Sequence, residues 1–288
     1  MKENFTVIGG DLRISTLAKL LAEDGNNVFV YGMENANFIE ENTKIIKCKS
    51  VEEAVKSSNI IIGSIPFSKS KNEMYAIFSE EHIQIDELIK GDNSKKIFIA
   101  GSISEDSKEI LEKNYMEVVD IMEYEQLAIL NTIATAEGAI EVAIKNTDTI
   151  LHGKNVLILG FGRVAKIVAK KFQGLSANIT CAARKPSDFA WITALGYNLI
   201  DINTIETEFW DFDIVINTVP KIIVDKDRMK FMKKNVLLID LASEPGGFDK
   251  NDAKTLDLKL ICALALPGKI APVTSAEFIK QTIYDNIL

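Results

Sequence analysis

The chain has 288 residues, of which 47% are hydrophobic, and a formal net charge of -8 with a pI near 5.1. This length and apolar content allow two domains with a core each, and they exclude a linker or a disordered tail. The acidic balance argues against a broad surface for nucleic acid or anionic membrane, so we expect neither as a partner, and an anionic substrate would need local positive charge.

Cysteine spacing and apolar runs narrow the class of protein further. Cys48, Cys181 and Cys262 lie far apart without a C-x-x-C pair, so we expect neither a disulfide framework nor a metal site. Cys181 and Cys262 lie in apolar strand-like runs, which predicts buried thiols. No basic and apolar leader opens the sequence, and no apolar run approaches about 18 residues, so we expect a cytoplasmic protein.

Strand-like and helix-like segments alternate through the first half, a pattern typical of α/β units around a parallel sheet. The expected strands are 5–10, 27–31, 60–65 and 96–100, with a helix near 13–24. The first turn, Gly9-Gly-Asp-Leu-Arg13, combines a helix N-terminus with a guanidinium, which makes Arg13 a candidate receptor for a carboxylate. A degenerate turn with a surface arginine explains the same residues equally well.

A long helix is expected between the two halves, because residues 123–146 contain few helix breakers and carry apolar side chains at helical spacing. Asn131, Thr135 and Gly138 fall on one stripe of this helix. A glycine inside a helix costs about 1 kcal/mol relative to alanine, so Gly138 indicates the close approach of another element or a ligand. Simple helix packing accounts for it about as well.

The second half repeats the alternation, so the sequence predicts two Rossmann-like, doubly wound α/β domains. Its expected strands are 155–159, 178–183, 213–218, 235–241 and 259–263. The runs 61–66 and 215–220 each end a buried strand with a small polar residue and a proline. Carboxyl ends of parallel strands form the ligand crevice of such sheets, so we expect these two ends to face each other across an interdomain cleft. A proline that only stops the strand is the alternative.

Residues 155–185 predict a dinucleotide site. An apolar strand leads into Gly160, Gly162 and Ala165 in G-x-G-x-x-A register, and an amphipathic helix follows. Gly160 permits the tight turn, Gly162 lets the backbone approach a pyrophosphate, and Ala165 lets the helix pack close to the strand. The helix N-terminus then faces the phosphates. A glycine turn needed only for packing is the alternative.

The end of the next strand indicates which dinucleotide is bound. NAD-binding folds usually have a carboxylate there for the ribose 2′-hydroxyl, whereas this strand ends Ala182-Ala183-Arg184-Lys185. Arg184 can hold a 2′-phosphate with two hydrogen bonds and Lys185 adds positive charge, so we expect NADP as the cofactor. A solvated basic turn is the alternative.

The chain closes with a turn-rich segment, 264–272, and a terminal helix that we expect to begin at Thr274 as N-cap, with Glu277 three residues on. In two-domain dehydrogenases such a helix often crosses back to the first domain. We therefore expect an N-terminal substrate domain, 1–122, with the helix 274–288 packed on it. The linker helix and the NADP-binding domain would occupy 123–273.

The two histidines argue against a 2-hydroxyacid dehydrogenase of the usual type, which needs an imidazole base near the nicotinamide. His82 lies in a charged run typical of a surface. His152 precedes the expected strand 155–159 and so lies at the amino end of the sheet, away from the glycine turn. The run 240–247, Asp-Leu-Ala-Ser-Glu-Pro-Gly-Gly, follows a buried strand and suits contacts to nicotinamide or substrate. A plain exposed loop is the alternative.

Six blocks of the sequence point to one family. They are 7–13 (VIGGDLR), 131–139 (NTIATAEGA), 159–163 (LGFGR), 216–220 (INTVP), 240–247 (DLASEPGG) and 266–272 (LPGKIAP). Together they resemble, from end to end, the A subunit of dipicolinate synthase. The departures are mild: Ile133-Ala134 stands where Ile-Pro is expected, and Glu244 stands where a basic or small residue is expected.

The resemblance implies NADP-dependent formation of dipicolinic acid, pyridine-2,6-dicarboxylate, from the dihydrodipicolinate-level product of the lysine pathway, in the mother cell of a sporulating bacterium. It also implies a partner, a flavoprotein-like B subunit, and we expect a homo-oligomer. Aromatisation drives the loss of hydride and proton, so no strong histidine base is needed. If the substrate is the hydroxylated tetrahydro precursor, loss of water comes first, and Glu137 or Asp240 are the catalytic candidates.

The two carboxylates of such a substrate require nearby cations, for which we choose Arg13 and Lys269. The candidate substrate-binding residues are Arg13, Ser64, Ser102, Asn131, Thr135 and Lys269. The candidate cofactor-binding residues are Gly160, Gly162, Arg163, Val164, Arg184, Lys185, Asn217, Thr218, Val219, Pro220, Leu241 and Ala242. Two other functions stay open: another NADP-dependent oxidoreductase of a small carboxylate, similar to shikimate dehydrogenase, and an NADP-binding regulatory subunit.

Overall fold

The computed structural model describes residues 2–36, 44–68, 70, 72–90, 94–207 and 211–288. The chain forms two compact units. The first unit comprises residues up to Leu130 together with Ala271–Leu288, and the second comprises Asn131–Ile270. The division falls inside one long helix, α4 (Glu125–Asn146).

The first unit is built on a six-stranded parallel sheet with the order β3-β2-β1-β4-β5-β6. Its strands are β1 (Asn4–Ile8), β2 (Asn27–Tyr31), β3 (Ile45–Lys47), β4 (Ile60–Ile62), β5 (Lys96–Ala100) and β6 (Met116–Asp120). Its helices are α1 (Leu12–Glu23), α2 (Val51–Ser57), α3 (Glu105–Glu112) and α10 (Pro272–Asn286), with 3₁₀ turns η1 (Ile85–Glu87) and η2 (Ile121–Glu123).

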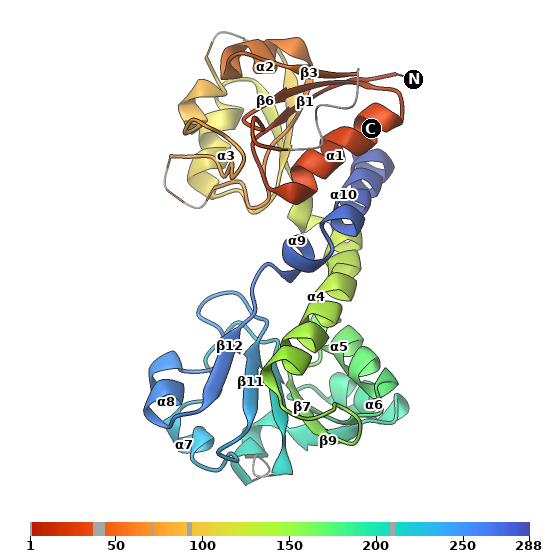
Figure 1. Cartoon of the computed structure of the whole chain (residues 1–288), viewed down its shortest axis with the longest axis vertical. Helices are drawn as coiled ribbons and strands as arrows, with labels where there is room; N and C mark the ends of the chain where they lie inside the picture. Colours follow the sequence, from red (N-terminus) through yellow and green to blue (C-terminus); the bar gives the residue numbers. More distant parts are fainter. Residues whose placement is uncertain (1, 37–43, 69, 71, 91–93, 208–210) are drawn as a thin grey trace. The chain divides into compact units, whose positions relative to one another are not determined.

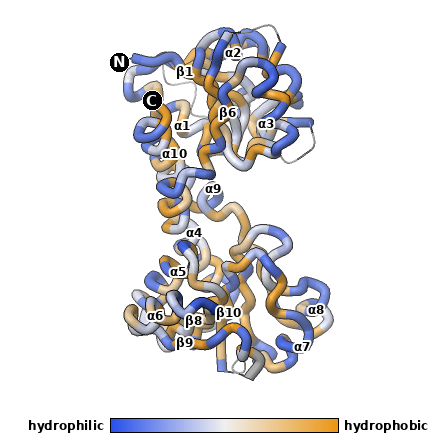
Figure 2. Tube along the Cα trace, turned by 180° about the vertical axis from the view of Figure 1, so that it is seen from behind, coloured by the Kyte–Doolittle hydropathy of each residue, from blue (hydrophilic) through white to orange (hydrophobic). Residues whose placement is uncertain are grey.

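Side chains alternate between the two faces of this sheet, which gives it a core on each side. Ile60 and Ile62 belong to the cluster that contains residues of α1 and α10, whereas Ile61 belongs to the cluster that contains residues of α2. All three are buried, as expected for a parallel sheet covered by helices on both faces. In Figure 2 hydrophobic colour runs along the strands in the interior of the unit, and hydrophilic colour lies on outer segments such as α2.

The terminal helix α10 lies beside α1 within the first unit (Figure 1). Lys280 Nζ and Tyr284 Oη bond to Asp24 Oδ2 at 2.9 and 3.0 Å, and Asn26 Nδ2 donates to Tyr284 Oη at 3.1 Å. Helix α10 begins at Pro272 without a side-chain cap, so the expected N-cap at Thr274 is wrong. Proline suits the first helical position because its φ is fixed and it lacks the N–H that would go unpaired there.

The second unit repeats the same parallel order, β9-β8-β7-β10-β11-β12. Its strands are β7 (Asn155–Leu159), β8 (Asn178–Ala183), β9 (Asn198–Asp201), β10 (Ile214–Asn217), β11 (Leu237–Asp240) and β12 (Lys259–Cys262). Its further helices are α5 (Arg163–Gly174), α6 (Pro186–Ala194), α7 (Lys226–Met229), α8 (Lys250–Thr255) and α9 (Leu266–Ile270), with η3 (Ile202–Thr207). The prediction of two doubly wound α/β domains is confirmed.

Helix α4 contributes to the core of the second unit. Ala136, Ala139 and Ala143 are fully buried in the same cluster as residues of β7 and α5. A Cβ added at Gly138 would lie 2.9 Å from Leu266 Cδ2, so the close approach of α9 accounts for this glycine. Within the described residues α4 is also the one helix long and apolar enough to cross a membrane, a property not expected from the sequence. The core helix of a globular protein can be equally long and apolar, and the buried alanines of α4 fit such a core helix.

Three strands were not predicted from the sequence, β3, β6 and β9, and each lies at an edge of its sheet. Their side chains are mostly half-buried or exposed, so they lack the apolar runs of the central strands. Cys262 also lies at a sheet edge, because it is the last residue of the edge strand β12. It is exposed for this reason, and its predicted burial is wrong. Cys181 of β8 is buried as predicted.

Candidate functional site

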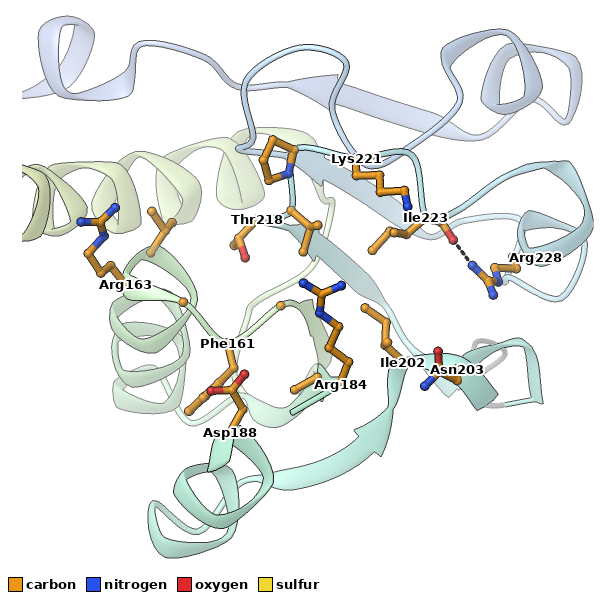
Figure 3. A pocket seen from close by; sticks show the side chains of 16 residues that line it. Phe161, Arg163, Arg184, Asp188, Ile202, Asn203, Thr218, Lys221, Ile223 and Arg228 are labelled. Atoms are coloured by element: carbon orange, nitrogen blue, oxygen red, sulfur yellow. Dashed lines mark hydrogen bonds between the residues drawn. The ribbon is translucent and has the colours of Figure 1, made fainter. Parts of the chain in front are cut away.

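A cavity of about 710 Å³ lies within the second unit, where β7, β8 and β10 end. The side chains that surround it are drawn in Figure 3. They belong to Gly160, Phe161, Gly162, Arg163, Val164, Ala183, Arg184, Asp188, Ile202, Asn203, Thr218, Val219, Pro220, Lys221, Ile223 and Arg228. Open α/β sheets bind ligands at this edge, where the strand order reverses on either side of the first strand.

The two glycines of the β7–α5 turn serve different purposes. Gly160 has φ +92°, a left-handed value that favours glycine, and an added Cβ would lie 2.7 Å from Thr218 Oγ1. Gly162 has φ -80°, and an added Cβ would meet nothing within 4 Å. Neither backbone conformation nor internal packing requires glycine at position 162, and the space beside its Cα is open.

Helix α5 supplies the chemistry for a phosphate at this turn. It has 12 residues, begins at Arg163 after Gly162, and has no side chain capping its first turn. The N-cap residue, Gly162, thus offers no side-chain acceptor to the first N–H groups, at the end where the helix dipole is positive. Ala165 is fully buried in the core, which brings the helix close to the sheet. These features fit the pyrophosphate of a dinucleotide.

Positive charge dominates the rest of the cavity. Arg163, Arg184, Lys221 and Arg228 line it, and among the described lining residues Asp188 carries the only carboxylate. Arg228 Nη1 donates to the backbone carbonyl of Ile223, a bond drawn in Figure 3. The surplus of cations suits a ligand with several anionic groups, although the whole chain carries a net charge of -8.

A buried pair supports one wall of the cavity from behind. Asn217 Nδ2 donates to Asp240 Oδ1 at 2.7 Å and to the Val219 carbonyl at 3.0 Å, and Val219 N donates back to Asn217 Oδ1 at 3.0 Å. Asp240 also accepts from Ala242 N at 3.1 Å and Gly247 N at 2.8 Å. The pair therefore fixes the lining segment 218–220 through the strand next to it.

Eight of the predicted cofactor residues line the cavity: Gly160, Gly162, Arg163, Val164, Arg184, Thr218, Val219 and Pro220. Four do not: Lys185, Asn217, Leu241 and Ala242. Lys185 is the N-cap of α6, and its backbone carbonyl accepts hydrogen bonds from Asp188 and Phe189. Asn217 acts through the hydrogen bonds that hold Val219 in place.

Several lining residues were not predicted from the sequence, namely Phe161, Ala183, Asp188, Ile202, Asn203, Lys221, Ile223 and Arg228. Lys221 directly follows the predicted turn 218–220, so adjacency alone could have indicated it. Arg228 lies in α7, a helix of four residues that is too short to produce a periodic pattern. Ile202 and Asn203 follow the unpredicted edge strand β9.

The two predicted catalytic carboxylates both have partners within the protein. Glu137 is exposed on α4 and forms an ion pair with Lys171 of α5. Lys171 lies eight residues after Arg163, about 12 Å along the helix axis from the end of α5 that meets the cavity. Asp240 is buried and accepts hydrogen bonds from three donors. Neither residue lines the cavity.

The first unit contains three of the predicted substrate residues. The Arg13 guanidinium is nearly buried, pairs with Asp11 at 2.7 Å and donates to the Ile65 carbonyl. Ser64 is buried and its hydroxyl donates to the Phe67 carbonyl at 2.9 Å. Ser102 is exposed, has φ 56° and donates its backbone N–H to Asp120 at 3.0 Å.

The glycine turn after β1 is covered by the segment 75–77 of the same unit, whereas the turn after β7 lines an open cavity. Gly10 N donates to the Tyr75 carbonyl at 2.8 Å, and Ile77 N donates to the Gly10 carbonyl at 3.1 Å. The N-cap of α1 is Asp11, whose carboxylate accepts from Arg13 N at 3.0 Å. A carboxylate already neutralises this helix end, so it is a poor receptor for a second anion.

The remaining substrate candidates belong to the second unit. Asn131 and Thr135 lie one turn apart on α4, and the Thr135 hydroxyl donates to the Asn131 carbonyl at 2.9 Å. Lys269 lies exposed on the short helix α9. Within the described residues it has no carboxylate partner, so its charge is available to a ligand.

Neither histidine lies at the cavity. The His82 side chain is 82% exposed and contacts Glu73, a carboxylate that raises the pKa of the imidazole. His152 is exposed in the turn before β7, at the opposite end of that strand from Gly160.

Burial raises the pKa of the Cys181 thiol to about 12, which makes it inert at neutral pH.

Two family models match the chain. The model of the N-terminal domain of the dipicolinate synthase A subunit matches residues 4–122. The model of the NAD-binding domain of D-isomer specific 2-hydroxyacid dehydrogenases matches residues 130–245, the part that contains the cavity. The chain is therefore an NAD(P)-dependent oxidoreductase.

Dipicolinate synthase A subunits are among the proteins that match over nearly the whole chain. The dipicolinate synthase A subunit of Bacillus subtilis is 29% identical over 282 residues, which cover 96% of this chain and 93% of the relative. The crystal structure of the A subunit from Bacillus halodurans has a TM-score of 0.89 at 29% identity, covering 98% and 97% of the two chains. The crystal structure of the Bacillus subtilis protein has a TM-score of 0.88 at 28% identity, covering 99% and 95%. Residues 4–122 therefore belong to the family of dipicolinate synthase A N-terminal domains, and the chain as a whole is similar to dipicolinate synthase A subunits.

Proposed function

We propose that this chain oxidises dihydrodipicolinate, or its hydroxylated tetrahydro precursor, to dipicolinate, and that NADP is the oxidant. The observation that carries the proposal is the cavity of the second unit, with an open Gly162, an uncapped helix end and a surplus of cations, in a chain similar to these subunits. The relatives are named as subunits of a dipicolinate synthase, which supplies the product of the proposed reaction.

The reaction balances as a two-electron oxidation. The ring of dihydrodipicolinate loses one hydride and one proton, and the product is the aromatic pyridine dicarboxylate. A nicotinamide cofactor held by the residues that line the cavity would supply the hydride acceptor. Aromatisation makes the proton acidic, so water or a weak base can remove it, and the exposed positions of both histidines are compatible with this chemistry. A hydroxylated substrate would first lose water, and then follow the same oxidation.

The choice of NADP rests on Arg184 at the end of β8. This residue lines the cavity where NAD-binding folds usually present a carboxylate to the ribose 2′-hydroxyl. Its planar guanidinium can donate two hydrogen bonds to a 2′-phosphate. Phe161 and Val164 line the same cavity and provide apolar surface.

For the substrate carboxylates we propose Lys269 as a direct contact, because it is exposed and carries no carboxylate partner within the described residues. Arg13 is the second candidate, although Asp11 already binds its guanidinium. Asn131, Thr135, Ser64 and Ser102 complete the proposed substrate set. Because the relatives are named as A subunits, we further propose a second subunit as the partner, a flavoprotein-like B subunit. A homo-oligomer in the cytoplasm completes the proposal.

The test couples the purified chain to aspartate semialdehyde, pyruvate and dihydrodipicolinate synthase, with NADP or NAD, and follows the ultraviolet absorbance of dipicolinate. Each reaction is run with and without the B subunit. Product with NADP supports the proposal, and product only in the presence of the B subunit identifies the heteromer as the active unit. Tight NADP binding without product in either reaction would contradict it and favour another oxidoreductase or a regulatory role.

A further inference from the structure

Two cations line the cavity from different elements. Arg184 follows β8, and Lys221 follows the turn after β10. Figure 3 shows the Arg184 guanidinium extending toward the wall that carries Thr218 and Lys221. Arg184 and Lys221 are both exposed. Across the described part of the chain, neither forms a hydrogen bond or an ion pair with a carboxylate.

This lack of partners sets the two residues apart from nearby lysines on an acidic protein. Lys230 pairs with Asp227 and Lys250 pairs with Glu244, each at 2.6 Å. A cation that points into a cavity without a counter-ion leaves positive potential there for a ligand. Arg184 and Lys221 therefore mark the cavity as a site for an anionic group.

The backbone that carries Lys221 is held in place. Lys221 N donates to the Val219 carbonyl at 2.9 Å, and Ile223 N and Val224 N both donate to the Gly247 carbonyl at 3.0 Å. Arg228 contributes a further bond to the Ile223 carbonyl. The Cα of Lys221 thus has a fixed position at the cavity edge, and only its side chain has to order when an anion binds.

We propose that Lys221, together with Arg184, binds the 2′-phosphate of the cofactor and thereby determines the preference for NADP over NAD. This inference rests on the proposed function. A phosphate monoester carries about 1.5 to 2 negative charges near neutral pH, more than one guanidinium neutralises. Asp188 also lines the cavity, shortly after Arg184 in the sequence, and its negative charge increases the need for a second cation. Lys185, the second cation expected from the sequence, does not line the cavity.

The test measures binding and requires no turnover. Isothermal titration calorimetry of the full chain compares NADP and NAD for the native protein and for Lys221→Met, Lys221→Arg, Lys185→Met and Lys226→Met. We expect Lys221→Met to weaken NADP binding about tenfold and to change NAD binding less than twofold, as for the loss of one charge-assisted contact. Lys221→Arg should retain the preference. Lys226 lies in α7 outside the cavity lining, so its variant is the matched control.

Three results would overturn the inference: a Lys221→Met protein that binds both dinucleotides as the native chain does, one that loses affinity for both equally, or a loss of the preference in Lys185→Met alone. A native chain that prefers NAD would overturn this inference and the NADP assignment together. A native chain that prefers NADP, loses this preference in Lys221→Met and forms no dipicolinate would contradict only the proposed reaction.

Discussion

Asn217 Nδ2 donates a hydrogen bond of 2.7 Å to Asp240 Oδ1, directly across the neighbouring strands β10 and β11. Both side chains are buried, and both also bond to the backbone that follows their own strand. Asp240 reaches Gly247 as well, whose carbonyl holds Ile223 and Val224. One buried amide and one buried carboxylate therefore fix two loops, and the loop 218–223 lines the cavity.

Asp240→Ala should destabilise the second unit and weaken cofactor binding. The substitution leaves buried donors of Asn217, Ala242 and Gly247 without their acceptor, which we expect to cost about 3 kcal/mol. Urea unfolding and NADP titration measure the two effects. Asp227→Ala, which removes an exposed carboxylate from α7, is the control and should change neither. An Asp240→Ala protein with native stability and native NADP affinity would disprove the supporting role.

Gly162→Ala and Gly160→Ala should separate cofactor binding from folding. A methyl group at position 162 meets nothing within 4 Å, so the melting temperature should stay unchanged while affinity for NADP falls. At position 160 the left-handed φ of +92° and the 2.7 Å approach to Thr218 Oγ1 should lower stability by at least about 1 to 2 kcal/mol. Thermal unfolding and NADP titration of both variants provide the comparison. Equal losses of stability would show that Gly162 serves packing instead.

The central strands of both sheets could be predicted because helices cover them on two faces and their residues are continuously apolar. Strand β7 is an example, with four buried residues in a row. Three of the four edge strands could not be predicted, because strands such as β3 and β9 are largely exposed and resemble loops. Strands at the edge of a sheet are less buried on their two faces, so they lack the continuous apolar run by which a central strand is predicted.

The turn from Gly160 to Arg163 was predictable because its chemistry is contiguous in the sequence. The opposite wall of the cavity comes from Lys221 and Arg228, and their distance from Gly160 depends on which strand lies next to β7. The strand beside β7 on this side is β10, and the order of strands in the whole sheet places it there, not the local sequence pattern. Arg13 shows the converse case, because its partner Asp11 lies only two residues earlier in the sequence and the ion pair is local.

Glu137→Gln should keep close to native turnover. The Glu137 carboxylate is 54% exposed and pairs with Lys171 on the surface, so the variant loses an ion pair of the kind that contributes about 0 to 1 kcal/mol. Steady-state dipicolinate formation and thermal unfolding are the measurements. Lys171→Met, which breaks the same pair from the other side, should behave alike. A large fall in kcat for Glu137→Gln alone would restore the carboxylate as the catalytic group predicted from the sequence.

Arg13→Ala should act on the stability of the first unit more than on substrate binding. The guanidinium is 9% exposed and joins Asp11 to the Ile65 carbonyl, so its removal leaves a nearly buried carboxylate unpaired, at a cost of about 3 kcal/mol. Arg13→Lys should recover only part of this, because an ammonium cannot reproduce the two-pronged contact. Chemical unfolding and the KM for substrate are compared. A KM raised tenfold with unchanged unfolding would instead place Arg13 against the substrate.

Tyr284→Phe should change how the stability of the first unit depends on alkaline pH. Burial and the Asp24 carboxylate raise the pKa of Tyr284 to about 12, whereas a tyrosine in the unfolded chain ionises near 10. Its contribution to folding is therefore complete below about pH 10 and is lost between about pH 10 and 12, where the unfolded chain gains from ionisation.

The measurement is the difference in urea midpoint between the native chain and Tyr284→Phe from pH 8 to 12. Tyr31 and Tyr197, whose pKa values are also raised, are present in both proteins and cancel in the difference. The difference should be constant up to about pH 10 and then fall. Asp24→Asn removes one of the two causes and should move the fall to lower pH, because burial of the phenol then acts without the neighbouring charge. A difference that stays constant to pH 12 would mean that Tyr284 ionises equally in the folded and unfolded chains, and that α10 does not hold its hydroxyl against Asp24.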